Sequence, residues 1–279
     1  MNKLITLERL NAKEVKELLP ENLLFLSFRG SIAHGMYVPK NDPNSIDDKD
    51  IFGVYMEELQ YYLGLDFYNN DKTLRENRER RKGTKERFIG EWDCVSHEIK
   101  KFLKLATRAN PNILSILWMP ERHVIYEHPL FKVVRQNKEI FLNKKQIYLA
   151  FRGYAKEQMD RMTTANFEGY MGAKRKSLVE RFGYDCKNAA HLIRLLRMCI
   201  EALTLNTFLV HREDAVELLE IKNGKWTLEA VRQEAARLFR LAEEAYNKST
   251  LPEEISEESE KKIEDIAINM ILEYHKLKK

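Results

Sequence analysis

Residues 23–55, LLFLSFRGSIAHGMYVPKNDPNSIDDKDIFGVY, carry the pattern that indicates the fold of this chain. Residues 23–28 are almost wholly apolar, which predicts a short strand buried on both faces. Gly30 and Ser31 follow in a turn of small residues, and residues 39–45 are rich in Pro, Asn and Asp, which predicts a loop. The stretch therefore predicts a strand, a tight turn and a second strand.

Two carboxylates stand at the start of the second strand. Asp48 and Asp50 are two positions apart, so in a strand that continues to Tyr55 both side chains point to the same face. Carboxylates are preferred ligands of Mg²⁺, and the backbone N–H groups and hydroxyl of a Gly-Ser turn can bind phosphate. Carboxylates that face such a turn suit a divalent cation holding a triphosphate, and we expect nucleotidyl transfer.

A third carboxylate would complete such a metal site. Asp93 is the first choice, on a strand predicted over residues 91–96. Glu91 lies on the same face of that strand and competes with Asp93 for the role. Asp47 is adjacent to Asp48 and would point to the opposite side of its strand. We therefore expect Asp48, Asp50 and Asp93 to be the metal ligands.

Composition sets broad limits on the class of protein. The chain has 279 residues and a net charge of +4 from 47 basic and 43 acidic residues, which permits a nucleic-acid partner without requiring one. Cys94, Cys186 and Cys199 are far apart, which favours reduced thiols over a disulfide framework. No apolar run is long enough to span a membrane, so we expect a cytoplasmic protein without a membrane partner. Walker, dinucleotide-binding, nucleophile-elbow and metalloprotease patterns are absent.

The pattern of secondary structure changes near residue 125. Residues 1–125 alternate strand and helix signals and include a highly basic insertion at about 71–90, expected to be exposed. Residues 126–279 are predicted to be helical except for a short hairpin near 219–227, which contains Asn-Gly. The predicted helices are 131–141, 145–162, 184–204, 212–219, 228–245 and 257–277. The expected fold is thus α+β, with a mixed sheet in an N-terminal domain and a C-terminal α-helical domain.

One predicted helix carries a basic stripe. Lys187, His191 and Arg194 are spaced i, i+4 and i+7, so they lie along one face of the helix that begins near residue 184. A triphosphate between the two domains would meet these cations. The alternative is that the lysine and arginine are solvated or ion-paired and the histidine is a hydrogen-bonded core residue. Lys174 and Arg175 are weaker candidates for contact with phosphate or RNA.

The motif around the two carboxylates resembles that of the DNA polymerase beta-type nucleotidyltransferase superfamily. It combines a Gly-Ser turn, an Asp-x-Asp strand and small residues at set places: Gly30, Ser31, Gly35, Ser45, Asp48, Asp50 and Gly53. The runs at 93–118 and 184–196 are similar to predicted nucleotidyltransferases of the YcgL type, some of which are associated with RNA repair. With these runs the likeness extends to about residue 225.

The resemblance implies a minimal nucleotidyltransferase fold with a helical companion domain. It also implies two Mg²⁺ ions, for which Mn²⁺ could substitute, a nucleoside triphosphate donor and a hydroxyl acceptor such as an RNA end. Gly30 and Ser31 would hold the outer phosphates. Two departures stand out: Ser31 and Asp48 are seventeen positions apart, longer than the usual spacing, and Ser115 stands where the family pattern has an acidic residue.

Two other functions fit the same sequence. One is a catalytically inactive module that binds a nucleotide or RNA. The other is a nucleotidyltransferase that modifies a partner protein, as in a toxin–antitoxin pair. The three carboxylates favour catalysis over the first, because a module that only binds need not keep them all. The sequence does not specify the base of the donor, the acceptor or the oligomeric state.

Overall fold

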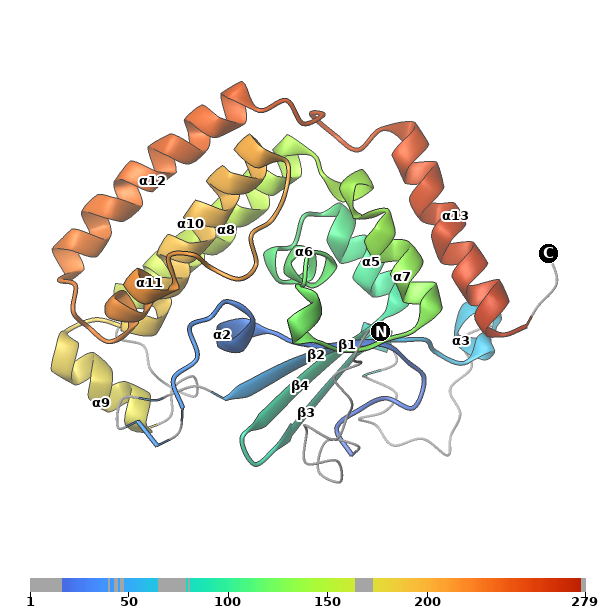
Figure 1. Ribbon diagram of the computed structural model, residues 1–279, viewed down its shortest axis with the longest axis horizontal. Helices are drawn as coiled ribbons and strands as arrows, with labels where there is room; N and C mark the ends of the chain where they lie inside the picture. The colour runs from blue at the N-terminus through green and yellow to red at the C-terminus, as the bar shows by residue number, and fades with distance from the viewer. Residues whose placement is uncertain are drawn as a thin grey trace.

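A five-stranded mixed sheet forms the base of the molecule (Figure 1). The computed structural model describes residues 17–39, 41–42, 45, 48–64, 79, 81–163 and 173–276. The strands are β1 (Leu23–Phe28), β2 (Lys49–Tyr55), β3 (Thr84–Ile89), β4 (Trp92–Glu98) and β5 (Val124–Glu127), in the order β3-β4-β2-β1-β5. β2 and β4 are parallel, and the other neighbouring pairs are antiparallel. The predicted strand at 23–28 is therefore present with the same bounds.

Part of the insertion predicted at about 71–90 forms the edge strand β3. Residues 84–89 pair with β4 in an antiparallel ladder, and the turn at Gly90 joins the two strands. Charged side chains are common on edge strands because they discourage pairing with other chains. The charges in this stretch obscured the strand pattern, so the strand was not predicted from the sequence. Arg87 pairs with Glu79, and Lys85 lies over the Tyr55 ring. Three arginines of the predicted insertion, at positions 75, 78 and 80, lie outside the described residues.

Helices cover one face of the sheet and extend beyond it (Figure 1). α5, α6 and α7 lie over the sheet, whereas α8, α10 and α12 pack together farther along the chain. The helices are α2 (Gly30–Ala33), α3 (Leu59–Leu63), α5 (Ile99–Thr107), α6 (Pro111–Leu117), α7 (Pro129–Gln136), α8 (Lys144–Thr163), α9 (Ala173–Phe182), α10 (Cys186–Leu205), α11 (Ala215–Lys222), α12 (Leu228–Lys248) and α13 (Glu257–Tyr274), with 3₁₀ turns at Glu121–His123 and Lys138–Phe141. The predicted α+β class is confirmed. Within the described residues, no helix is long and apolar enough to cross a membrane.

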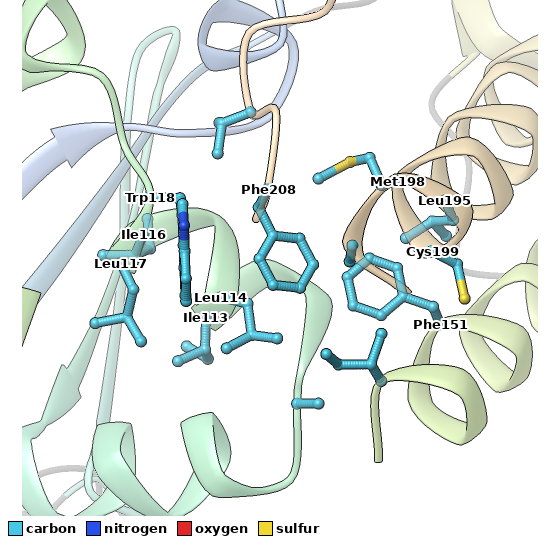
Figure 2. Packing of buried hydrophobic residues seen from close by; sticks show 14 of the residues in the cluster. Ile113, Leu114, Ile116, Leu117, Trp118, Phe151, Leu195, Met198, Cys199 and Phe208 are labelled. Carbon is cyan, nitrogen blue, oxygen red and sulfur yellow. The ribbon is translucent and has the colours of Figure 1, made fainter. Parts of the chain in front are cut away.

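An aromatic contact joins the helices over the sheet to the outer helices. Phe208, in the segment after α10, lies between Trp118 at the end of α6 and Phe151 on α8 (Figure 2). Its ring centroid is 5.0 Å from Trp118 in an edge-to-face contact and 5.5 Å from Phe151 in a stacked one. All three side chains are buried. Because tightly packed aromatic side chains resist displacement, this contact fixes the two groups of helices relative to each other.

The Asn-Gly pair near residue 223 ends a helix, and the predicted hairpin at 219–227 is wrong. α11 continues to Lys222, and Gly224 follows with φ of +72°. The amide of Gly224 bonds to the carbonyl of Ile221 at 3.0 Å, and the amide of Lys225 bonds to that of Glu220 at 3.0 Å. These two bonds form a Schellman motif. Asn-Gly favours positive φ in hairpin turns and helix ends alike, so the dipeptide alone did not distinguish them.

An ion-pair network ties α10 to the segment before α11 and to α12. Asp214 accepts hydrogen bonds from Arg212 at 2.8 Å and from Arg197 at 2.7 Å. Arg212, which is buried, also pairs with Glu201, and Arg197 reaches Glu217 at 2.6 Å. Burial raises the pKa of Asp214, but the two arginines outweigh burial and hold the pKa below its ordinary value. Ionised Asp214 therefore stabilises the fold.

We expect Asp214→Asn to lower the free energy of unfolding by about 2 kcal/mol at pH 7, because two charge-assisted hydrogen bonds weaken. The folded-state pKa is depressed, so this stabilisation is present above the unfolded-state value near 3.9 and is lost as the pH falls through the folded-state value. Denaturant titrations of the wild type and the variant from pH 7 to pH 3 should show that the difference between their free energies of unfolding shrinks below about pH 4. The exposed Asp265→Asn serves as the control, and a difference that is constant with pH would contradict the account.

Candidate active site

A cavity of about 580 Å³ lies between one end of the sheet and the helices α6, α8 and α10. β2 and β4 contribute Asp50 and Asp93 to one wall, and α10 contributes Lys187, His191 and Arg194 to another. Its volume falls within the usual range for small-molecule and cofactor sites. With Gly30 and Ser31, which also line it, the cavity brings together seven of the eight site residues predicted from the sequence.

The two aspartates are neighbours across the parallel pair β2 and β4. Asp50 and Asp93 are Cα partners in the register, so their side chains leave adjacent strands on the same face. Arg29 lies against both: its Nη2 donates to Oδ2 of Asp93 at 3.0 Å and is 3.7 Å from Oδ1 of Asp50. Sequence analysis missed Arg29, although it directly precedes the Gly-Ser turn. The carboxylates thus share one arginine as their nearest positive charge.

Burial is the main influence on the ionisation of Asp50. Burial raises its pKa to about 6; Arg29 lowers the value, whereas Asp93 and Asp48 raise it. Lys187, across the cavity, lowers it as well. A carboxylate in this setting gains from any additional cation nearby, because the cation favours its ionised form.

Two other candidate carboxylates, Asp48 and Glu91, are outside the cavity lining. Asp48 precedes β2 and is not among the residues that line the cavity. Glu91 also lies outside the lining and forms an ion pair with Lys49. Asp47 falls outside the described residues. In the described part of the chain, no three His, Cys, Asp or Glu side chains form a group that could hold a metal ion. The structure therefore sets Asp50 beside Asp93, whereas Asp48 lies outside the cavity lining although its charge still acts on Asp50.

This pair of carboxylates fits Mg²⁺. The ion is usually held by one or two carboxylates together with water and substrate phosphates, not by a complete protein cage. Asp50 and Asp93 supply carboxylates of that kind, and a bound cation would favour the ionised form of Asp50, whose pKa is raised by burial. Ions bound here would be held jointly by these side chains and by the ligand.

The Gly-Ser turn lies directly against the pair. Gly30 has φ of +59°, and a Cβ built on it would lie 2.4 Å from Oδ2 of Asp50. Only glycine meets both conditions without strain. The hydroxyl of Ser31 is buried at the cavity, and within the described residues it has no hydrogen-bond partner. A buried hydroxyl without a partner is costly, and a ligand phosphate oxygen would satisfy it.

Basic groups, of which Arg194 is buried, form the opposite wall. The side chain of Arg194 is 7% exposed and donates to Sδ of Met198 at 3.2 Å, but it forms no ion pair with any described carboxylate. Burial, reinforced by Arg212, lowers its pKa to about 10. Burial also lowers the pKa of His191 well below its usual value, with Arg194 and Lys187 acting in the same direction, so the imidazole is neutral at pH 7. An anionic ligand would stabilise this wall.

Further cations reach the cavity from elements that the sequence analysis did not connect with it. Arg161 on α8, Arg175 on α9 and Lys222 on α11 all line it. Nζ of Lys222 donates to the carbonyl oxygen of Met36 at 3.0 Å. Arg175 was a weaker candidate in the sequence, whereas the side chain of Lys174 lies outside the described part. Lys222 was missed because its segment was assigned to a hairpin, and no local pattern marks Arg161.

The first turn of α10 is held in place by a capping aspartate. Asp185 is buried and accepts hydrogen bonds from the amides of Lys187 at 3.1 Å and Asn188 at 3.2 Å. Arg175 pairs with the same carboxylate at 2.7 Å and donates to the side chain of Asn188 at 2.9 Å. The cap fixes the start of α10 and joins it to α9, so the backbone of Lys187 has a defined position at the cavity.

Comparison with known proteins identifies a family. The model of the family described as "RNA repair pathway DNA polymerase beta family" (RlaP) matches residues 2–269. The resemblance seen in the sequence is thus confirmed. No curated protein matches the chain. A crystal structure of a nucleotidyltransferase-like protein from Exiguobacterium sibiricum aligns with 84% of this chain and 72% of its own, at 9% identity and a TM-score of 0.26. At that TM-score the structural likeness carries no argument about the site.

We expect Gly30→Ala to destabilise the protein by roughly 2–4 kcal/mol, through left-handed strain and the clash with Asp50. Gly90→Ala is the matched control: Gly90 has φ of +60°, but its added Cβ would meet nothing within 4 Å. That variant should cost only about 1 kcal/mol, from strain alone. Denaturant titrations of both variants give the comparison, and equal losses would show that Gly30 does not contact Asp50 as described.

Proposed function

Since the chain belongs to the RNA repair pathway DNA polymerase beta family, we propose that it is a magnesium-dependent nucleotidyltransferase. It would transfer a nucleoside monophosphate from a nucleoside triphosphate to a hydroxyl acceptor, and the family description favours an RNA end as that acceptor. The observation that carries the proposal is the cavity in which Asp50 and Asp93 face Lys187 and Arg194. A metal-binding wall opposite a phosphate-binding wall is what this reaction requires.

The carboxylates have the metal-binding role. Asp50 and Asp93 would hold two Mg²⁺ ions, with Mn²⁺ as a substitute, and Asp48 would join them as a further ligand. When bound, the ions would neutralise charge on the triphosphate and favour attack by the acceptor oxygen on the α-phosphorus. A bond forms between these two atoms as the bond to the departing pyrophosphate breaks. We assign Asp93 to the acceptor side of the site.

The basic wall and the turn have the phosphate-binding role. Lys187 and Arg194 would pair with the phosphate oxygens, and the Ser31 hydroxyl would donate a hydrogen bond to an outer phosphate. Gly30 leaves room for the backbone to approach Asp50 closely. Neutral His191 can donate one hydrogen bond and accept another. We also propose a cytoplasmic location, which the free thiols of all three cysteines support.

A nucleotide-binding module without catalysis is the second candidate. The observation that favours it is the position of Asp48 outside the cavity lining, which leaves two carboxylates where three were expected. A binding module would hold the nucleotide through its basic wall, so its affinity would be unaffected by a chelator. A transferase needs the metal for turnover. Chelation therefore separates the two candidates.

We expect Asp50→Asn and Asp93→Asn to reduce transfer of labelled nucleotide to RNA by on the order of a thousandfold, roughly 4 kcal/mol of barrier. Asparagine keeps the size of the side chain and removes the charge that binds metal. Chelation should abolish activity, and Mg²⁺ or Mn²⁺ should restore it. Asp48→Asn tests the third ligand separately.

Glu91→Gln is the matched control, because Glu91 lies two residues from Asp93 but outside the cavity lining. This variant should keep nearly the full rate. Near-normal turnover in the Asp50 and Asp93 variants would refute the assignment. Loss of nucleotide transfer in the Glu91 variant would instead assign Glu91 as a metal-binding carboxylate.

We expect Arg194→Met to have opposite effects on stability and binding. Removing a buried cation that lacks a described ion-pair partner should stabilise the ligand-free protein by about 1–2 kcal/mol. It should also weaken binding of a nucleoside triphosphate at least about tenfold, because a phosphate contact is lost. Thermal unfolding and calorimetric titration measure the two effects.

Arg197→Met makes the same change three residues further along α10, where the arginine is ion-paired with Asp214 and Glu217. It should destabilise the protein by about 2 kcal/mol and leave nucleotide affinity nearly unchanged. If Arg194→Met were destabilising and bound nucleotide normally, Arg194 would be a structural residue.

A further inference from the structure

A second concavity, of about 310 Å³, lies beside α5. It is called here the α5 basic groove, and its basic side chains are Arg81, Lys82, Lys100, Lys101, Lys104 and Arg108. Tyr61 and Leu105 complete the lining together with Glu98, the one carboxylate among the described residues there. The chain as a whole is nearly balanced in charge, with a net charge of +4, so six cations around one small groove are a marked local concentration.

The single carboxylate does not neutralise this charge. Glu98 is fully buried, and its oxygens accept hydrogen bonds from the amides of Lys100 at 2.9 Å and Lys101 at 3.0 Å and from the hydroxyl of Tyr62 at 2.7 Å. These bonds cap the first turn of α5. The carboxylate is therefore used inside the protein, and the exposed Lys100, Lys104 and Arg108 present positive charge to solvent.

The cations in the groove crowd one another. Nζ of Lys101 donates to the carbonyl of Lys82 at 2.7 Å and to the hydroxyl of Thr84 at 2.5 Å, both uncharged acceptors. Burial and then the charge of Lys82 lower the pKa of Lys101, and they outweigh Glu86, which raises it. Like charges placed this close repel each other, and a bound anion would relieve the repulsion. The groove is thus suited to a ligand with several negative charges.

The exposed cations follow a line along the helix. Lys100, Lys104 and Arg108 are exposed and spaced i, i+4 and i+8, so they run along one face of α5 and its cap over about 12 Å. An extended chain of phosphates matches such a line better than a single phosphate does. Tyr61 adds an aromatic ring at the groove, on which a base can stack.

The end of this line is close in sequence to residues of the cavity of the proposed active site. Arg108 caps the C-terminus of α5, and Asn110, two residues later, caps α6. Nδ2 of Asn110 donates to the hydroxyl of Tyr154 at 2.7 Å, and both Tyr154 and Asn112 line the cavity. Arg108 of the groove and Asn112 of the cavity are therefore four residues apart in the chain.

We propose that the α5 basic groove binds the phosphate backbone of a single-stranded RNA whose end enters the cavity as the acceptor. The proposal rests on the proposed function, because it supplies the acceptor for that reaction. Lys100, Lys104 and Arg108 pair with successive phosphates, and Tyr61 stacks on a base. A line of cations with one stacking ring follows a single strand without reading its sequence.

The test is binding of a fluorescein-labelled 20-nucleotide RNA, followed by anisotropy at several KCl concentrations. The triple variant Lys100→Gln, Lys104→Gln, Arg108→Gln removes three exposed cations of the groove. The control triple variant Arg232→Gln, Arg240→Gln, Lys261→Gln removes three exposed cations on α12 and α13, so both proteins carry the same net charge. Both sets lie on helix surfaces, and thermal unfolding checks that each variant is folded.

The groove variant should bind RNA at least about tenfold more weakly, and the slope of log K against log salt should become less negative by about 2, from three lost phosphate contacts. The control variant should bind as wild type does. Equal weakening in the two variants, an unchanged slope in the groove variant, or no RNA binding by the wild type would overturn the proposal. DNA of the same sequence should bind more weakly and accept less label. Equal binding and labelling of DNA would contradict the proposal that the bound strand is RNA.

The affinity for nucleoside triphosphate separates this proposal from the proposed function. The groove variant should bind the triphosphate within about twofold of wild type, because no groove cation lines the cavity. If the wild type binds RNA through the groove but neither binds nor transfers a nucleotide, the proposed function is wrong and the proposal for the groove is supported. If transfer to RNA is normal in the groove variant, the groove proposal fails and the proposed function stands.

Discussion

The site depends on the parallel pairing of β2 with β4. This register sets Asp50 beside Asp93 on one face of the sheet, and Arg29 reaches both from the end of β1. A shift of one residue in either strand would turn one carboxylate to the opposite face. Phe52 and Val54 on β2 belong to the core beneath the helices, so packing holds the register that aligns the two aspartates.

The empty cavity contains charged groups whose burial costs stability. Burial raises the pKa of Asp50, and buried Arg194 forms no ion pair with any described carboxylate. Both conditions cost stability in the empty protein. They persist because the surrounding structure is firmly held, by Phe208 between α6 and α8 and by the Asp185 cap of α10. A ligand that brings phosphates and cations together would relieve both.

Local patterns in the sequence were enough to predict much of the fold and part of the site. The apolar run 23–28, the Asp-x-Asp strand and the stripe from Lys187 to Arg194 each follow from spacing within one element, and the structure forms those elements. Contacts between distant segments were not predictable in this way. Lys222 lines the cavity because α11 packs near Met36, 186 residues earlier in the chain.

Two errors have the same physical origin, because short motifs are compatible with more than one backbone. Gly224 adopts positive φ at a helix end, where a hairpin turn would have required the same conformation. β3 carries charges on an exposed edge and looked like a loop. For Asp48, which lies outside the cavity lining, the i, i+2 rule gives the direction of the side chain and not its distance from a cavity.

The most direct test of the central claim is a crystal structure with Mg²⁺ and a nucleoside triphosphate analogue that cannot be cleaved between the α- and β-phosphates. The account predicts metal density at Asp50 and Asp93 and triphosphate density between that pair and the basic wall of Lys187 and Arg194. An analogue bound elsewhere, or bound in this cavity with its phosphates away from both walls, would contradict it.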